Sequence, residues 1–127
     1  MKIAILHDYF EIRGGGERLV ITLAKHLNAD LIYGFWSPTS YSIEGISGRS
    51  LNAYTPVLGW RTVKQIRAFK GVEDLDKYDV VVYSGNDAIF ARSSRTKGAN
   101  IFYCHTPPRH VYDKRDYYYQ QQGIAGK

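Results

Sequence analysis

Four short apolar runs alternate along the sequence with stretches that are polar or have helical spacing. The runs at 3–6, 31–35, 79–84 and 100–104 are rich in Ile, Leu, Val and aromatic residues, as expected for interior strands of a parallel sheet. Their alternation with helical segments predicts an α/β fold. We expect residues 1–127 to form a single Rossmann-like domain with a doubly wound, mainly parallel sheet in a three-layer α/β/α arrangement.

Three segments between these runs have recognisable patterns. Apolar residues at helical spacing predict a helix over 18–27, and residues 37–55, which lack a clear period, predict a long loop with room for short strands. A short helix is expected after the turn at Gly85 and Asn86, through position 90 or 91. Between positions 60 and 70 an apolar residue and then a basic one recur every three residues, which predicts a basic amphipathic helix. Its apolar members are Trp60, Val63, Ile66 and Phe69, and its basic members are Arg61, Lys64, Arg67 and Lys70.

Composition narrows the class of protein. With 44% hydrophobic residues the chain of 127 can bury one core, and its single cysteine, Cys104, excludes an intramolecular disulfide and a cysteine-cluster metal site. No run approaches the roughly 20 apolar residues of a membrane span, and the start of the chain does not resemble a signal peptide. We therefore expect a cytoplasmic protein. The formal charge of +5 favours an anionic partner.

The candidate chemistry begins where the first strand meets the first helix, at Gly14, Gly15 and Gly16. Glycines allow a ligand to approach the backbone, and the first N–H groups of a helix lack intrahelical partners, so this turn predicts a phosphate site. The dinucleotide pattern G-x-G-x-x-G fails because its third glycine position is Leu19. The P-loop pattern fails because Glu17 follows the last glycine.

Several segments together resemble a known family. They are Lys2-Ile3-Ala4-Ile5-Leu6-His7-Asp8-Tyr9, the loop Gly14-Gly15-Gly16-Glu17, Tyr78-Asp79-Val80-Val81-Val82 and Tyr103-Cys104-His105-Thr106-Pro107-Pro108-Arg109-His110-Val111-Tyr112-Asp113. In this order they look like the N-terminal half of family-4 retaining glycosyltransferases of the GT-B fold. The combination of Cys-His-Thr-Pro with the triple-glycine loop is the most specific part of the resemblance.

The resemblance implies a domain that recognises the acceptor and faces a second Rossmann-like domain across a cleft. That C-terminal GT-B domain, which holds most of the sugar nucleotide, is absent from this sequence, and the N-terminal domain itself looks truncated. The full enzyme would transfer a hexose with retention from a nucleotide sugar to a glycan or lipid-linked acceptor, as in polysaccharide biosynthesis. The nucleotide sugar is a substrate, and neither a cofactor nor a metal is expected. The 127 residues alone are expected to be inactive.

The resemblance also assigns roles to single residues. Gly14, Gly15 and Gly16 would contact the donor diphosphate, and His105 would be the catalytic-site residue, positioned to hydrogen-bond the transferred sugar or the acceptor. The candidate residues on the acceptor side are His7, Asp8, Ser84, Asn86 and Arg109. Each has a structural alternative: loop shaping for His7 and Asp8, capping of the next helix for Ser84 and Asn86, and a solvated surface role for Arg109. Neighbouring residues in an extended segment point in opposite directions, so His7 and Asp8 are not expected to bond each other.

Other partners follow from surface properties. The helix around Trp60, Arg61, Lys64, Arg67 and Lys70 is a candidate for docking on an anionic membrane, at its inner face, and the alternative is a sheet-packing helix with a solvated outer face. A truncated sheet would expose an edge and an apolar face, through which two copies could form a homodimer. Nucleic acid is not an expected partner, because the basic residues are dispersed. The alternative function is a stand-alone phosphate- or nucleotide-binding module without catalytic activity, or a self-associating fragment.

Overall fold

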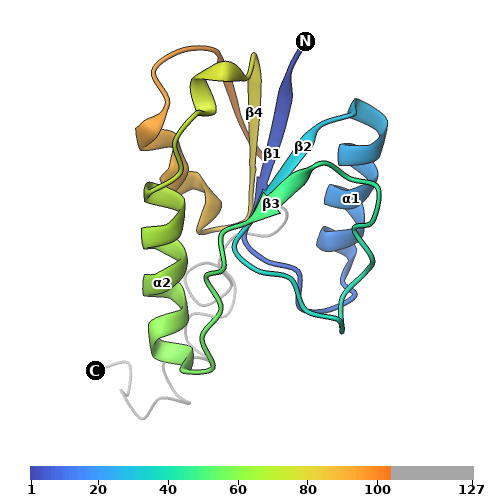
Figure 1. Ribbon diagram of the computed structural model, residues 1–127, viewed down its shortest axis with the longest axis vertical. Coiled ribbons are helices and arrows are strands. Elements are labelled where there is room, and N and C mark those ends of the chain that lie inside the picture. Colours follow the sequence, from blue (N-terminus) through green and yellow to red (C-terminus); the bar gives the residue numbers. More distant parts are fainter. Residues whose placement is uncertain (104–127) are drawn as a thin grey trace, which may run out of the picture.

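The computed structural model describes residues 1–103, except for the side chain of Leu58 (Figure 1). Within this range strands alternate with α-helices (α) and 3-10 helices (η). In chain order these are β1 (Ile3–His7), α1 (Gly15–Leu27), β2 (Asp30–Tyr33), β3 (Gly48–Ser50), α2 (Leu58–Lys70), η1 (Leu75–Lys77), β4 (Val80–Ser84), η2 (Ala88–Ser94) and β5 (Ala99–Tyr103).

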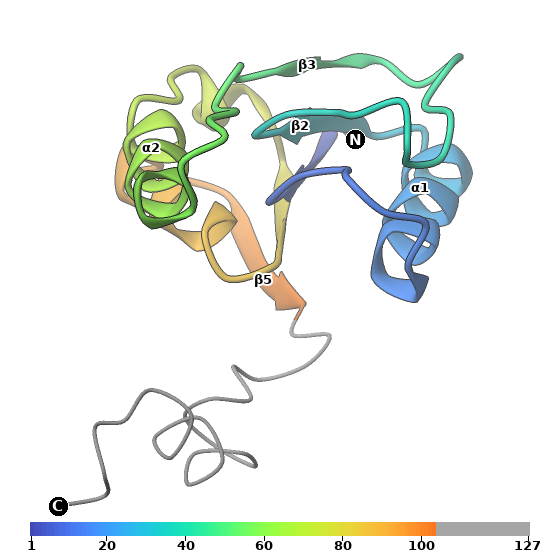
Figure 2. The same ribbon diagram turned by 90° about the horizontal axis from the view of Figure 1, so that it is seen from below.

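The five strands form one parallel sheet in the order β3-β2-β1-β4-β5. Figure 2 shows α1 on one side of this sheet and α2 on the other, so the described residues form three layers. The predicted α/β, Rossmann-like parallel arrangement is thereby confirmed. Parallel neighbours need crossover segments, which is why helices lie on both faces of the sheet.

Each face of the sheet carries its own core. In β1, Ala4 and Leu6 point towards α2, whereas Ile5 points towards α1, because successive side chains of a strand alternate between the faces. The core under α2 also contains the fully buried Phe69, and the core under α1 contains Val20. Both faces of β1 are therefore buried, which explains why its sequence is continuously apolar rather than alternating.

The structure specifies two of the predicted segments more closely. Helix α1 begins at Gly15, before the predicted start at position 18, so two of the glycines lie inside its first turn. Strand β3 is a short strand within residues 37–55, the predicted loop with room for short strands, and it pairs with β2 through the register of Leu31 with Gly48. A Cβ atom at Gly48 would lie 1.8 Å from the main-chain oxygen of Leu31, so only glycine permits this close approach.

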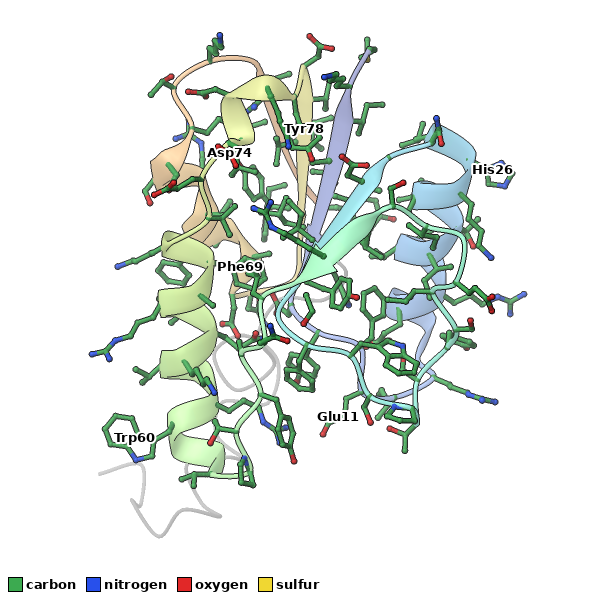
Figure 3. The ribbon with its side chains drawn as sticks, viewed as in Figure 1. Glu11, His26, Trp60, Phe69, Asp74 and Tyr78 are labelled. Atoms are coloured by element: carbon green, nitrogen blue, oxygen red, sulfur yellow. The ribbon has the colours of Figure 1, made fainter. Side chains whose placement is uncertain are left out.

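Helix α2 forms as predicted, but its buried face is not the predicted apolar stripe. Phe69 and Gln65 are fully buried, whereas Trp60 is 64% exposed, and Figure 3 shows Trp60 pointing away from the sheet. A repeat of three residues falls about 60° short of a full turn at each step, because a helix has 3.6 residues per turn. Trp60 and Phe69, three such steps apart, therefore lie on opposite sides of α2.

None of the helices among residues 1–103 is long and apolar enough to cross a membrane.

Replacing the two aromatic residues of α2 should give contrasting results. Phe69→Ala is expected to lower the free energy of unfolding by about 3–5 kcal/mol, because it leaves a cavity in the core under α2. Trp60→Ala, the matched exposed variant, should change it by no more than about 0.5 kcal/mol. Urea denaturation followed by circular dichroism measures both values. Equal losses in the two variants would contradict the burial pattern described above.

Candidate functional site at the carboxyl edge of the sheet

Four of the predicted site residues, His7, Asp8, Ser84 and Asn86, meet at the carboxyl ends of β1 and β4, two neighbouring strands inside the sheet. From β1 the chain passes through α1 to β2, which lies beside β1 on the side of β3. From β4 it passes through η2 to β5, which lies at the opposite edge of the sheet. This divergence makes the β1–β4 edge the topological switch point, where open parallel sheets bind ligands. The glycine turn at Gly14–Gly16 follows β1, and Gly85 and Asn86 follow β4.

Asp8 organises this edge through its carboxylate. Its two oxygens accept hydrogen bonds from the backbone N–H groups of Asn86 at 2.8 Å, Asp87 at 2.9 Å and Ala88 at 2.8 Å. The N-cap residue of η2, Asp87, makes no side-chain cap of its own. The predicted capping of this helix by residues of its own turn is therefore replaced by a cap from the end of β1. A carboxylate suits this place because it is paired with otherwise unsatisfied N–H groups.

The main-chain oxygen of Asp8 is bonded as well. It accepts the N–H of Gly34 at 2.9 Å and the side-chain amide of the buried Gln65, from α2, at 2.8 Å. A Cβ at Gly34 would lie 2.4 Å from this main-chain oxygen of Asp8 and 1.6 Å from the Gln65 Oε1 atom, so glycine is required there. Asp8 thus joins the ends of β1 and β2, the turn after β4 and the middle of α2.

Gly85 is required by the same arrangement. Its φ of +105° is unfavourable for other residues, and a Cβ would lie 2.4 Å from the Asp8 carboxyl carbon. The sequence pattern named Gly85 only as part of a turn, and it did not single out Gln65. A glycine directly after a buried strand is a signal for a close approach of this kind, whereas Gln65 on a helix carries no such signal.

His7 and Ser84 occupy matching positions at the ends of β1 and β4. The His7 Nδ1 atom lies 3.1 Å from the Ser84 Oγ atom, and both residues are buried. The His7 ring also lies 4.8 Å from the ring of Phe10. His7 therefore bonds across the sheet while Asp8 caps η2, which agrees with the expectation that the two side chains do not bond each other.

The glycine turn leads into α1 with Gly14 as the N-cap residue, and no side-chain hydrogen bond caps this end of the helix. A Cβ at Gly15 would meet nothing within 4 Å, and none of the three glycines has a positive φ. Glu17 lies in the first turn, and its carboxylate reaches back over Gly14, where a Cβ would be 2.4 Å from Oε2. Its negative charge fits the helix dipole there.

Beside the glycine turn, Arg61 of α2 joins a cluster of aromatic and acidic side chains. Its guanidinium lies 3.2 Å from the Glu11 carboxylate, and it stands 5.5 Å from the ring centre of Phe35 and 5.3 Å from that of Tyr54. Tyr9 stacks on Phe35 at 4.9 Å, and burial, followed by the charge of Glu11, raises the pKa of the Tyr9 hydroxyl. The position of Glu11 in Figure 3 locates this cluster at the same end of the molecule.

The basic residues of α2 do not form a uniform exposed face. Arg61 is turned towards Glu11, Lys64 donates to the main-chain oxygen of Tyr54 at 2.8 Å, and the Lys70 ammonium lies 5.6 Å from the ring centre of Phe90. Trp60 is exposed, and so are Lys64, Arg67 and Lys70, whereas Arg61 is partly buried. Three of the four basic residues predicted for membrane docking therefore contact other parts of the same chain.

Two of the predicted site residues, His105 and Arg109, lie outside the described residues. Within residues 1–103, no group of three or more His, Cys, Asp or Glu side chains has an arrangement that could hold a metal ion.

Comparisons of the chain with protein-family models, with curated proteins and with solved structures gave no match.

Asp87 gives this edge a pH-dependent contribution to stability. Burial, followed by repulsion from the Asp8 carboxylate, raises the pKa of Asp87 to about 6, above the usual aspartate value of about 4. Between about pH 4 and pH 6 the folded chain binds more protons at Asp87 than the unfolded chain does. The contribution of Asp87 to the free energy of unfolding therefore falls as the pH rises from about 4 to about 6, and the loss is complete above about pH 6.

Asp87→Asn should therefore stabilise the chain at pH 7, with a smaller gain at pH 4, as measured by the urea midpoints of both proteins. Asp74→Asn is the control, because Asp74 is exposed and lies outside this edge. An equal gain at both pH values, or the same gain in the control, would contradict the assignment.

Asp8→Asn tests the cap itself. The variant keeps the shape of the side chain but removes its charge and replaces one acceptor oxygen by an NH₂ group, which faces backbone donors. We expect a loss of about 1.5–3 kcal/mol in the free energy of unfolding at pH 7, typical of hydrogen bonds to a charged group. Amide hydrogen exchange should also accelerate at Asn86, Asp87 and Ala88. An unchanged exchange rate at these three amides would show that the carboxylate does not hold them.

Proposed function

We propose that this chain is the N-terminal, acceptor-side part of a retaining glycosyltransferase similar to family 4. The whole enzyme would transfer a hexose from a nucleotide sugar to a glycan or lipid-linked acceptor. In this proposal the N-terminus of α1, at Gly14, Gly15 and Gly16, contacts the donor diphosphate. Asp8, Asn86 and the buried pair His7 and Ser84 shape the neighbouring acceptor side, where Asn86 is exposed.

One observation carries the proposal: the fold gives no reason for glycine at Gly15, in the first turn of α1. None of the three glycines of this turn has a positive φ, and there is open space where a Cβ of Gly15 would be. Glycine in a helix costs up to about 1 kcal/mol relative to alanine, so a structural role would not favour it here. Glycine at position 15 leaves the N–H groups beside it open to close approach by an anion, whereas the Glu17 carboxylate occupies the space over Gly14.

The surroundings of the turn support an anionic ligand at α1 rather than at η2. The N–H groups at the start of η2 are already bonded to the Asp8 carboxylate. Helix α2 also begins without a side-chain cap and has no acidic residue in its first turn. However, it carries a single glycine there, Gly59, and it does not directly follow a central strand. Gly59 nonetheless provides a matched comparison, because its Cβ would also meet nothing within 4 Å.

Gly15→Ala should abolish contact with an anion without harming the fold. We expect pyrophosphate and uridine diphosphate to shift the amide NMR signals of Gly15 and Gly16 in the unaltered chain, with weak affinity. The added methyl group of Gly15→Ala should remove these shifts while leaving the urea midpoint equal or slightly higher. Gly59→Ala should retain them. Shifts centred on the start of α2, or none at millimolar ligand, would contradict the proposed phosphate contact.

Activity and affinity separate the proposal from its alternative. As part of a larger enzyme, the 127-residue chain should release no sugar from a nucleotide sugar, and calorimetry should find at most weak binding of nucleoside diphosphates. Tight binding without turnover would instead favour a stand-alone nucleotide-binding module. Turnover at the rate of a complete enzyme would contradict the proposal that the chain is only a part.

A further inference from the structure

The two edges of the sheet differ in how well they are protected against pairing with another strand. Strand β3 has three residues and carries the exposed Arg49. Strand β5 has five residues, none of them charged and none of them proline, and all five are exposed. The side chains of Ile101 and Phe102 are 49% and 50% exposed. Short strands and charged residues normally protect an edge, and β5 has neither.

Strand β5 is nevertheless firmly attached to the sheet. It pairs with β4 along its whole length, and the buried Arg95 donates to the main-chain oxygens of Asp79 at 3.3 Å and Ala99 at 3.1 Å. The Tyr83 hydroxyl donates to the Asn100 Oδ1 atom at 2.9 Å. In Figure 2, β5 lies at the edge of the sheet opposite β3. Among residues 1–103 no element covers the outer edge of β5, and an ordered strand at such an edge is a template for a further strand.

The backbone register decides which groups this edge presents. The N–H of Ala99 donates to the Asp79 oxygen at 2.9 Å, so the backbone groups of Ala99 face β4. These groups alternate along a strand, and those of Ile101 therefore face β4 as well. The N–H and C=O groups of Asn100 and Phe102 face away from β4, towards the open edge.

We propose that β5 pairs with β5 of a second copy of this chain, antiparallel and about a two-fold axis through Ile101. In this register Asn100 lies opposite Phe102 of the second copy, and both use the backbone groups that face outwards. Ile101 lies opposite Ile101 of the second copy in a non-hydrogen-bonded pair, the type of antiparallel pair in which the side chains lie closest together. Every residue of β5 then has a partner, which no other two-fold register achieves.

The side chains and charges fit a second copy. Ile101 is in register with Val82, whose side chain belongs to the core under α1, so the contact between the two Ile101 side chains would extend an apolar surface. Each copy has a formal charge of +5, but β5 contains no charged residue. Pairing of the two β5 strands therefore places no like charges opposite each other. In such a dimer the two outer edges are the β3 strands, which are short and carry Arg49. A two-fold contact also uses the same surface of both copies and leaves none of it free for a third, so association should stop at two copies.

The size of the contact predicts a weak dimer. One pair of five-residue strands buries less than the roughly 800 Å² per partner of a standard stable interface. The equilibrium between monomer and dimer should therefore depend on concentration within the micromolar to millimolar range. The glycine turn and β5 share no residue, so variants at Ile101 test this strand contact separately from the proposed phosphate contact.

A charge-swap experiment on the 127-residue chain tests this register. Analytical ultracentrifugation should find dimer in the unaltered chain at high concentration, and only monomer for Ile101→Lys and for Ile101→Glu, since each would place like charges opposite each other. An equimolar mixture of the two variants should recover the dimer, because Lys and Glu then face each other across the axis.

The controls make every outcome informative. Circular dichroism checks that both variants fold, which is expected because Ile101 is half exposed. Arg49→Glu, on the other edge, should leave the dimer unchanged. A chain that stays monomeric at the highest concentration, a dimer that survives Ile101→Lys, or a mixture that does not associate would each overturn the proposal.

Discussion

The Asp8 carboxylate is the interaction on which the carboxyl edge of this sheet depends. It accepts three backbone N–H groups from a turn almost 80 positions later in the chain, and its main-chain oxygen accepts two further donors. Buried or half-buried N–H groups must be paired, so this one residue satisfies the start of η2. The glycines at 34 and 85 follow from it, because any side chain there would occupy the space of Gln65 or Asp8.

Local sequence patterns were sufficient to predict the strands and their parallel arrangement, with one exception. The apolar runs of β1 and β4 predict interior strands because both of their faces are buried. Strand β3, with the sequence Gly48-Arg49-Ser50, has no such signal. It forms because the backbone of Gly48 fits against β2, a property that depends on the tertiary contact and not on local propensity.

The candidate site was predictable in its location but not in its internal contacts. A glycine turn after a buried strand and before a helix predicts the start of α1 at the carboxyl edge, because strand, turn and helix are contiguous. The bonds of Asp8 to the turn after β4, of His7 to Ser84 and of Arg61 to Glu11 join residues 50 to 80 positions apart. No spacing rule connects such pairs, and the polar side chains at these positions have several structural alternatives each.

The internal cap on η2 also gives this edge an electric polarity. The start of α1 combines the positive end of its helix dipole with the single carboxylate of Glu17, whereas Asp8 and Asp87 place two carboxylates at the end of β4. An elongated ligand with one anionic end would therefore be repelled more strongly at η2 than at α1, so its neutral end would be turned towards the β4 turn. The same residue that holds the fold together would thereby select the direction in which such a ligand lies across the sheet.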